Sequence, residues 1–285
     1  MLAAVGQICS TNNVSRNAAL CVSLIRRAAA ARCALLFLPE ASDFIADAKE
    51  VPRLSVSLDE SEFVRKVRAQ AKESAIFVGV GVHEKATENK CYNTNLLISP
   101  DGEIVKAYRK LHLFDVKHSG PAGGVMMESN TTIQGDELLD PHETPIGKVG
   151  LLTCYDLRFP EPALSLRRRG AQVIAYPSAF TLTTGPAHWE VLLRARAIEN
   201  QCYILAPAQI GQHSPSRQTH GHAMIVDPWG GVVAQAPDRP PKFPPPDDAD
   251  TGTFVMHDVD LEWVEQMRKE MPLWEQRRGD VYPLL

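Results

Sequence analysis

Cys154 is the first residue of this sequence whose type and position could do chemistry. It follows the apolar run Val149 to Thr153, which is typical of a buried strand, and a helix is expected from Glu161. Open α/β sheets place their sites at the carboxyl ends of strands. Backbone N–H groups and the positive end of a helix favour the thiolate form of a cysteine. Cys154 is therefore a candidate nucleophile, with a buried and inert cysteine as the alternative.

Two further residues of reactive types follow apolar strands in the same way. Glu40 comes directly after Leu36 to Pro39, where a carboxylate is either a desolvated base with a raised pKa or a helix N-cap. Lys110 lies just past a hairpin strand and could also be an ordinary solvated lysine. His112 could be the base instead, since a Cys–His pair is the common thiol arrangement. The residues alone leave these choices open.

His220 and His222 come closest to a metal-binding pattern, but no third ligand stands at a sensible spacing. The pattern favours a satisfied pair on a strand. The cysteines at positions 9, 21, 33, 91, 154 and 202 contain no C-x-x-C pair, so a zinc knuckle or a thioredoxin-type motif is not indicated. We expect neither a metal nor another cofactor.

Apolar strands alternate with helical patterns, which predicts a single α/β domain over residues 1–285. Helices are expected at about 14–32, 61–74, 161–169, 187–201 and 261–271. Strands are expected at about 1–8, 35–38, 75–82, 92–98, 103–108, 149–153, 173–176, 203–208, 222–226, 232–235 and 254–259. The stretch Phe114 to Pro141 is expected to be a long functional loop. A Pro- and Asp-rich loop insertion is expected at about 237–250.

Composition and charge narrow the class of protein. The formal net charge is −4, which leaves no basic stripe to neutralise phosphates, and we expect no nucleic-acid partner. No apolar run is long enough to span a bilayer, and we expect no membrane partner. Scattered cysteines are typical of a reducing compartment, which favours the cytoplasm. No transit peptide is visible, and a mitochondrial form made from an alternative start stays open.

In this order, Glu40, Lys110 and Cys154 resemble the Glu-Lys-Cys triad of the nitrilase, or carbon–nitrogen hydrolase, superfamily. The surrounding strings are similar too, as are others across nearly the whole chain: residues 37–40, 108–113, 154–161, 176–180, 184–190, 194–197 and 221–230. In detail the chain is most similar to the Nit branch and, within it, to the deaminated glutathione amidases. The Pro-rich insertion after Pro237 is the main departure.

The resemblance implies a four-layer α-β-β-α sandwich, nitrilase-like, that forms a homodimer through helices. It implies that Cys154 is the nucleophile, Glu40 the proton acceptor and donor, and Lys110 the oxyanion stabiliser. It also implies a supporting role for Glu128, so that the long loop from Phe114 forms a wall of the active site.

Arg158 matches the position at which relatives bind a substrate carboxylate. Its alternative is a structural ion pair with Glu161 or Asp156. The other residues expected to bind substrate are Tyr155, whose backbone N–H is a second candidate oxyanion donor, Phe180 and His112.

These features predict a small acidic amide as substrate. The resemblance implies hydrolysis of deaminated glutathione to 2-oxoglutarate and cysteinylglycine through a cysteine thioester. One alternative is an omega-amidase, which releases ammonia from 2-oxoglutaramate. Another is a non-catalytic interaction protein on the same scaffold, against which the presence of all three triad residues argues. A nitrile-hydrolysing enzyme gains little support from an arginine that suits acidic substrates.

Overall fold

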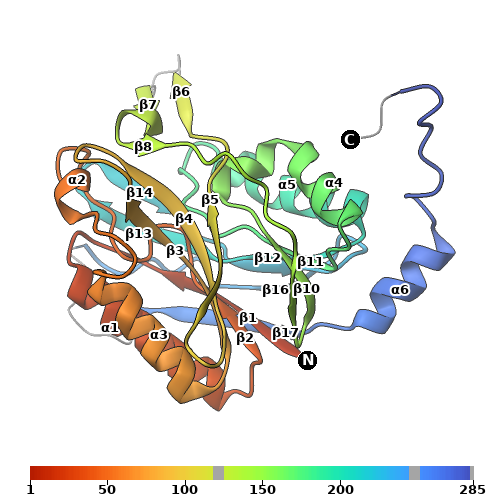
Figure 1. Ribbon diagram of the computed structural model, residues 1–285, viewed down its shortest axis with the longest axis horizontal. Coiled ribbons are helices and arrows are strands. Elements are labelled where there is room, and N and C mark those ends of the chain that lie inside the picture. The colour runs from red at the N-terminus through yellow and green to blue at the C-terminus, as the bar shows by residue number, and fades with distance from the viewer. Residues whose placement is uncertain (118–124, 244–250, 283–285) are drawn as a thin grey trace.

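Two β-sheets pack face to face at the centre of the molecule, and helices cover both outer faces (Figure 1). The computed structural model describes residues 1–117, 125–243 and 251–282. Helices α1 (Val14–Ala30) and α3 (Glu62–Ser74) pack on the first sheet. Helices α4 (Pro160–Arg168) and α5 (Gly185–Asn200) pack on the second. The predicted four-layer α-β-β-α sandwich is confirmed.

The first sheet has nine strands in the described part of the chain. Seven of them follow the order β14 (Arg217–His220), β13 (Ala208–Ser214), β1 (Leu2–Ile8), β2 (Leu35–Phe37), β3 (Phe77–Lys85), β4 (Cys91–Ile98) and β5 (Ile104–Arg109). β17 (Thr253–Asp258) pairs antiparallel with β1, and β8 (Thr132–Ile133) pairs parallel with β4. β1, β2 and β3 run parallel, so their carboxyl ends lie at one edge.

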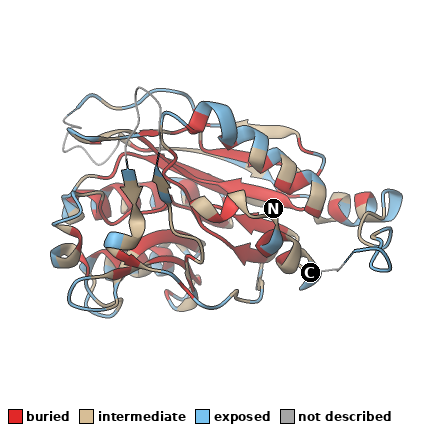
Figure 2. Cartoon of the chain, turned by 90° about the horizontal axis from the view of Figure 1, so that it is seen from above, coloured by how far each residue is buried: buried red, intermediate tan, exposed pale blue. Residues whose placement is uncertain are grey.

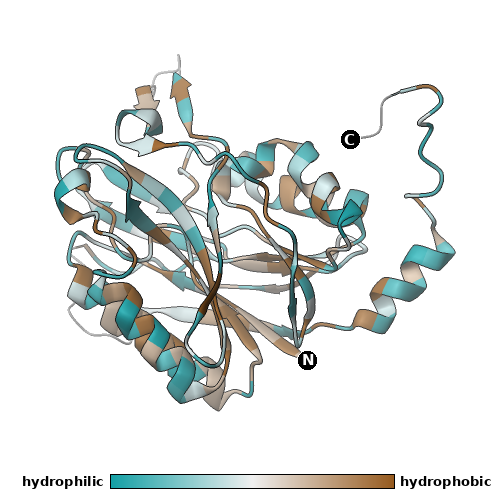
Figure 3. Ribbon diagram, viewed as in Figure 1, coloured by the Kyte–Doolittle hydropathy of each residue, from teal (hydrophilic) through white to brown (hydrophobic). Residues whose placement is uncertain are grey.

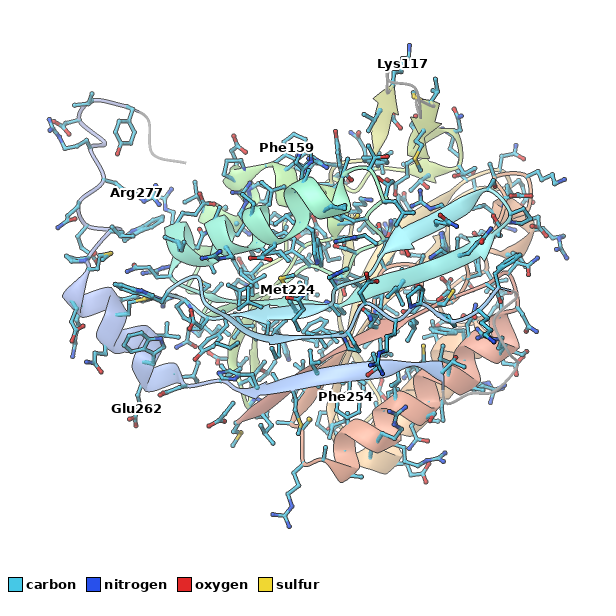
Figure 4. The ribbon with its side chains drawn as sticks, turned by 180° about the vertical axis from the view of Figure 1, so that it is seen from behind. Lys117, Phe159, Met224, Phe254, Glu262 and Arg277 are labelled. Carbon is cyan, nitrogen blue, oxygen red and sulfur yellow. The ribbon has the colours of Figure 1, made fainter. Side chains whose placement is uncertain are left out.

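The second sheet has six strands among the described residues. Their order is β16 (Val232–Gln235), β15 (Met224–Val226), β12 (Tyr203–Ala206), β11 (Val173–Ala175), β10 (Gly147–Leu151) and β9 (His142–Thr144). β10, β11 and β12 run parallel. A separate two-stranded sheet joins β6 (Asp115–Lys117) to β7 (Val125–Met127). Figure 4 shows this hairpin, which carries Lys117, rising on the same side of the molecule as Phe159.

Side chains alternate between two cores because successive residues of a strand point to opposite faces. Leu35 and Phe37 of β2 lie in the core between the sheets, and Leu36 lies in the core under α1 and α3. Figure 2 shows the strands buried and the outward faces of the helices exposed. In Figure 3 the same helices carry hydrophobic residues toward the sheet and hydrophilic residues toward solvent. The continuous apolar run Leu35 to Leu38 therefore encodes a strand that is buried on both faces.

Polar side chains cap the starts of two helices. The Asn13 side chain accepts a hydrogen bond from the Arg16 backbone N–H and caps α1. The Ser61 side chain accepts from the Val64 backbone N–H and caps α3. Such caps satisfy donors that the first helical turn leaves without partners. The strands and helices expected from the sequence are present, most with ends shifted by one to three residues.

The segment after Tyr203 departs from the prediction of one strand at 203–208. β12 ends at Ala206, and β13 begins at Ala208 in the other sheet. Pro207 separates them, because a proline has no N–H to donate to the ladder. The hairpin of β13 and β14 that follows was not predicted, since its polar side chains hide the period-2 pattern.

Two other segments contain structure that the sequence did not indicate. The expected loop from Phe114 to Pro141 contains β6, β7, β8 and a short 3₁₀ helix, η1 (Glu128–Asn130). A second 3₁₀ helix, η2 (Cys154–Arg158), lies between β10 and α4. In the predicted Pro-rich insertion, positions 244–250 lie outside the described residues.

Two further helices complete the described structure. The short α2 (Val51–Leu54) follows the region of Glu40, and α6 (Leu261–Glu270) follows β17. From α6 the chain runs away from the sheets toward the C-terminus (Figure 1). Among the residues that the structure describes, no helix combines the length and apolar character needed to cross a bilayer.

Candidate active site

Three strand ends from two sheets meet at one cavity of about 260 Å³. Glu40 follows β2 and Lys110 follows β5 in the first sheet, whereas Cys154 follows β10 in the second. All three side chains are buried, and all three line the cavity together with Glu128. The face-to-face packing of the sheets thus brings together residues that lie up to 114 positions apart in the sequence, from Glu40 to Cys154.

Lys110 lies between two carboxylates. Its Nζ is 2.9 Å from Glu40 Oε1 and 2.9 Å from Glu128 Oε2. Asn93 of β4 joins the same network, because its Nδ2 donates to Glu40 Oε1 at 2.8 Å and to Glu128 Oε1 at 3.0 Å. The Phe114 backbone N–H donates to Glu128 Oε2 at 2.7 Å. The bonds from Lys110 hold its ammonium between the carboxylates, and those from Asn93 and Phe114 hold the carboxylates themselves.

The backbone at Cys154 adopts a conformation that non-glycine residues seldom take. Its φ is +44°, and its N–H donates to the Pro177 carbonyl at 3.0 Å. A positive φ costs free energy in a residue with a Cβ and persists only where the surroundings hold it. Here Cys154 is the first residue of η2, at the point where the chain turns after β10. The first N–H groups of such a helix have no partner within it, which leaves the Tyr155 N–H beside the cysteine.

The Cys154 thiol is protonated, contrary to the expected thiolate. Burial and the nearby Glu40 carboxylate raise its pKa, and Lys110 and the Ala179 backbone N–H only partly oppose them. The helix that begins at Cys154, η2, is a 3₁₀ helix of five residues, so the stabilisation expected from a helix end is small. Attack by this thiol therefore requires a base.

Glu40 is ionised, contrary to the raised pKa that its buried position suggested. Burial raises its pKa, but the Lys110 ammonium and hydrogen bonds from Lys110, Cys154 and Asn93 lower it further, to below the ordinary value. Burial lowers the pKa of Lys110, yet Glu128 and Glu40 hold it well above the ordinary value. The site thus holds a carboxylate and a neutral thiol beside a permanent ammonium.

Arg158 extends from η2 into the same cavity. Its guanidinium carbon lies 5.6 Å from the ring centroids of both Tyr155 and Phe180, and its Nη1 is 3.1 Å from His188 Nδ1. In the described part of the chain it forms no ion pair with Glu161 or Asp156, so the structural alternative considered for Arg158 has no support there. Tyr155 and Phe180 also line the cavity.

His112 does not line this cavity, although it was expected to bind substrate. Its Nδ1 lies 2.7 Å from Asp156 Oδ1, and its ring stacks on Phe159 with a centroid distance of 3.8 Å. Asp156 is fully buried and also accepts hydrogen bonds from Tyr108 Oη at 2.7 Å and from the Thr153 N–H at 2.9 Å. The imidazole therefore supports the turn that carries Cys154.

Sequence reasoning missed two residues that position the glutamates. Asn93 lies in the middle of an apparently ordinary strand, and only its contacts to Glu40 and Glu128 mark it. Gly81 of β3 packs directly against the backbone of Glu40, where an added Cβ would lie 2.6 Å from the Glu40 Cα. The Gly-x-Gly pattern of 79–81 within a strand was the available signal, because glycine in a strand often marks a close approach of backbone.

The two histidines do not lie on one strand as expected: His220 ends β14, and His222, whose φ is +61°, lies between β14 and β15. The rings of His220 and His222 stack with centroids 4.0 Å apart, and His222 Nδ1 is 2.9 Å from the His220 carbonyl oxygen. Within the ranges 1–117, 125–243 and 251–282, no group of three or more His, Cys, Asp or Glu residues is arranged to hold a metal.

Comparison with known proteins decides the family. The sequence matches the carbon–nitrogen hydrolase family over residues 2–269. The chain belongs to this family. It is 47% identical to the probable hydrolase nit2 of Schizosaccharomyces pombe, over 100% of this chain and 99% of that protein. It is 44% identical to deaminated glutathione amidase of Bos taurus, over 99% of this chain and 83% of that protein.

A solved structure agrees with this assignment. The crystal structure of Caenorhabditis elegans NitFhit matches with a TM-score of 0.88 and 43% identity, over 99% of this chain and 66% of that longer chain. The resemblance to the Nit branch of the nitrilase superfamily is confirmed. This carbon–nitrogen hydrolase is an amidase, and its fold is that of the superfamily.

Proposed function

We propose that this amidase hydrolyses the amide bond of deaminated glutathione and releases 2-oxoglutarate and cysteinylglycine. The observation that carries the proposal is Arg158, a cation without a carboxylate partner in the described structure, in the cavity of Glu40, Lys110 and Cys154. Relatives 44% identical to this chain are named for that activity, which supports the choice among acidic amides.

In the first half of the proposed reaction, Glu40 takes the proton of the Cys154 thiol while the sulfur attacks the amide carbon. The carbonyl oxygen becomes an oxyanion, which the Lys110 ammonium and the Tyr155 backbone N–H stabilise. One such donor typically contributes about 3–4 kcal/mol to the transition state. Glu40 then protonates the leaving nitrogen, the carbon–nitrogen bond breaks, and a thioester remains on Cys154.

In the second half, Glu40 removes a proton from water, which attacks the thioester carbon. The acid product leaves, and the proton returns to the sulfur of Cys154 through Glu40. Glu128 keeps the ammonium of Lys110 in place and makes a wall of the cavity. No cofactor takes part in these steps as proposed.

Arg158 holds the carboxylate of the acyl half. A guanidinium can form two parallel hydrogen bonds to a carboxylate, and the faces of Tyr155 and Phe180 hold it by cation–π contact. An omega-amidase would use the same acyl half, because 2-oxoglutaramate differs only in the group that leaves.

Two substrates test the proposal directly. We expect kcat/KM to be at least about tenfold higher for deaminated glutathione than for 2-oxoglutaramate. Mass spectrometry of the acid-quenched reaction should show a 2-oxoglutaryl adduct on the peptide that contains Cys154. A higher kcat/KM for 2-oxoglutaramate would assign the protein to the omega-amidases, and turnover of neither substrate would refute the proposed acyl group.

The pH profile tests the assigned protonation states. The active form needs the Glu40 carboxylate, whose pKa lies below its ordinary value, so activity falls only at acid pH. It also needs the Cys154 thiol and the Lys110 ammonium, whose pKa values both lie above the ordinary ones. We therefore expect kcat/KM to stay level from about pH 5.5 to about pH 9.

The measurement is kcat/KM for deaminated glutathione at constant ionic strength. A limb of the kcat/KM profile with its midpoint at about pH 6.5 would indicate a histidine base. That outcome would contradict Glu40 as the base.

We also propose that the protein is a cytoplasmic homodimer and that 1–285 is one domain. A dimer is supported by exposed apolar side chains along α5 and the neighbouring turn, since such groups mark interfaces: Val191, Ile198 and Trp229. The cytoplasm is supported by six cysteines that are all free and buried.

A further inference from the structure

A second arginine reaches the cavity from the opposite sheet. Arg217 is the first residue of β14, on the edge hairpin that the sequence did not predict, and it lines the cavity with Cys154. Its Nη2 donates to the Ala179 carbonyl at 3.2 Å, and its Nη1 is 3.6 Å from the sulfur of Met126 on β7. The guanidinium is thus held in place on two sides.

Both partners of Arg217 are uncharged. Among the residues that the structure describes, no carboxylate forms an ion pair with it, and the two contacts use two of its five N–H donors. A half-buried cation with donors to spare is a binding site for an anion, because burial without a counter-charge is unfavourable. Arg158 is also half-buried and also has no carboxylate partner among the described residues. The cavity therefore contains two such arginines.

Consecutive residues connect both arginines to the nucleophile. Ala179 donates its N–H to the Cys154 sulfur and accepts a hydrogen bond from Arg217 through its carbonyl. The next residue, Phe180, lies under the Arg158 guanidinium. Arg158 comes from η2 after the second sheet, and Arg217 comes from the edge of the first. The reacting carbon at Cys154 therefore has one arginine from each sheet near it.

We infer that Arg217 binds the carboxylate of the leaving half of the substrate, the C-terminal carboxylate of cysteinylglycine. The inference rests on the proposed function. Deaminated glutathione carries a carboxylate at each end, with the amide that is cleaved between them. Arg158 holds the end that stays on Cys154, and a single guanidinium cannot reach both ends of an extended chain. The second arginine accounts for the second carboxylate.

This assignment makes Arg217 a specificity-determining residue. Its contact exists with deaminated glutathione and has no counterpart with 2-oxoglutaramate, whose leaving group is ammonia. Loss of Arg158 weakens both reactions, whereas loss of Arg217 weakens only the one with a charged leaving group. Selection between the two substrates thus depends on the β13–β14 hairpin.

The test is Arg217→Met, which keeps the length and apolar stem of the side chain. We expect kcat/KM for deaminated glutathione to fall by about 10- to 50-fold relative to its change for 2-oxoglutaramate. Most of the loss should appear in KM. Arg217→Lys should recover part of it, because an ammonium still attracts the carboxylate but cannot bind it through two parallel hydrogen bonds. Gln218→Met, the exposed neighbour on β14, is the matched control and should keep the wild-type ratio.

A second measurement uses the wild-type protein and depends on no variant. In deaminated glutathione with a C-terminal glycinamide, the carboxylate of the leaving half is replaced by a neutral amide. We expect wild type to lose about the same factor with this compound as Arg217→Met loses with the acid. For Arg217→Met, kcat/KM should then be the same for the acid and the amide, since the substitution and the glycinamide remove the same contact.

The outcomes separate this inference from the function on which it rests. If wild type hydrolyses deaminated glutathione but does not discriminate acid from amide, Arg217 is not the carboxylate site. An equal loss on both substrates in Arg217→Met would also overturn the inference and place its effect on the acyl half or the fold. If wild type does not turn over deaminated glutathione at all, the proposed function fails, and the leaving-group assignment fails with it.

Discussion

Replacing Cys154 with alanine is expected to lower kcat by at least about 10⁴-fold, because Cys154 is the one cysteine among the described residues that line the cavity. The fold should remain. The side chain is small, and the turn at Cys154 is held by the Cys154 N–H to Pro177 and by the buried Asp156 beneath it. We expect the free energy of unfolding to change by less than about 1.5 kcal/mol.

Single-turnover assays and urea unfolding measure the two quantities. Cys21→Ala is the matched control, since Cys21 is also buried but belongs to the core under α1 and does not line the cavity. That variant should lose about 1 kcal/mol of stability and keep its activity and its acyl adduct. Wild-type turnover in Cys154→Ala, with the adduct on another residue, would contradict the assignment of the nucleophile.

Replacing Lys110 with methionine is expected to lower kcat/KM by about 10³-fold and to destabilise the protein by about 3–5 kcal/mol. The reaction loses its charged oxyanion donor. The fold loses the counter-charge of two buried glutamates, Glu40 and Glu128, which already share the Asn93 amide. Without the ammonium, burial and mutual repulsion raise the pKa of at least one of these carboxyl groups.

The raised pKa gives the variant a pH dependence of stability with a defined sign. A carboxyl group whose folded pKa exceeds its unfolded value stabilises the fold at acid pH, and this stabilisation is lost as the pH rises through the folded pKa. Lys110→Met should therefore differ more from wild type at pH 8 than at pH 5 in urea unfolding. The base is then protonated over part of that range, and the acid limb of kcat/KM moves to higher pH.

Lys110→Arg should not restore activity, because the planar guanidinium is larger and the site leaves the side chain only 2% exposed. Lys106→Met is the control. Lys106 lies on the same strand, β5, but takes no part in the hydrogen bonds that Lys110 makes to the two glutamates. It should resemble wild type in activity and stability. Equal destabilisation of Lys110→Met at pH 5 and pH 8 would show that the charge network does not control the protonation of Glu40.

The strand ends were predictable because the signals are local. An apolar run followed by a polar residue of reactive type is visible in a few letters, as at Glu40 and Cys154. The apolar run of β2 marked a buried strand in the same way, and the structure shows that its side chains divide between two cores. Glu128 had no such signal and came from family resemblance, and the structure places it 2.9 Å from Lys110. Asn93 had no signal that separates it from ordinary strand residues, and the signal for Gly81 was the Gly-x-Gly pattern of 79–81.

The chain by itself determined the elements, their order and the reactive residues at their ends, because periodicity, caps and turn residues act over short distances along the sequence. The tertiary structure decided which of those residues meet and in what state. Glu40 and Lys110 are 70 positions apart, and their contact makes Glu40 an ionised base, although burial alone would have made it neutral. Burial and the neighbouring carboxylate keep the Cys154 thiol protonated. The packing of the sheets places Arg217, which lies on an unpredicted hairpin, at the same cavity. Charge states and binding sites depend on neighbours in space, and no local pattern of residues records them.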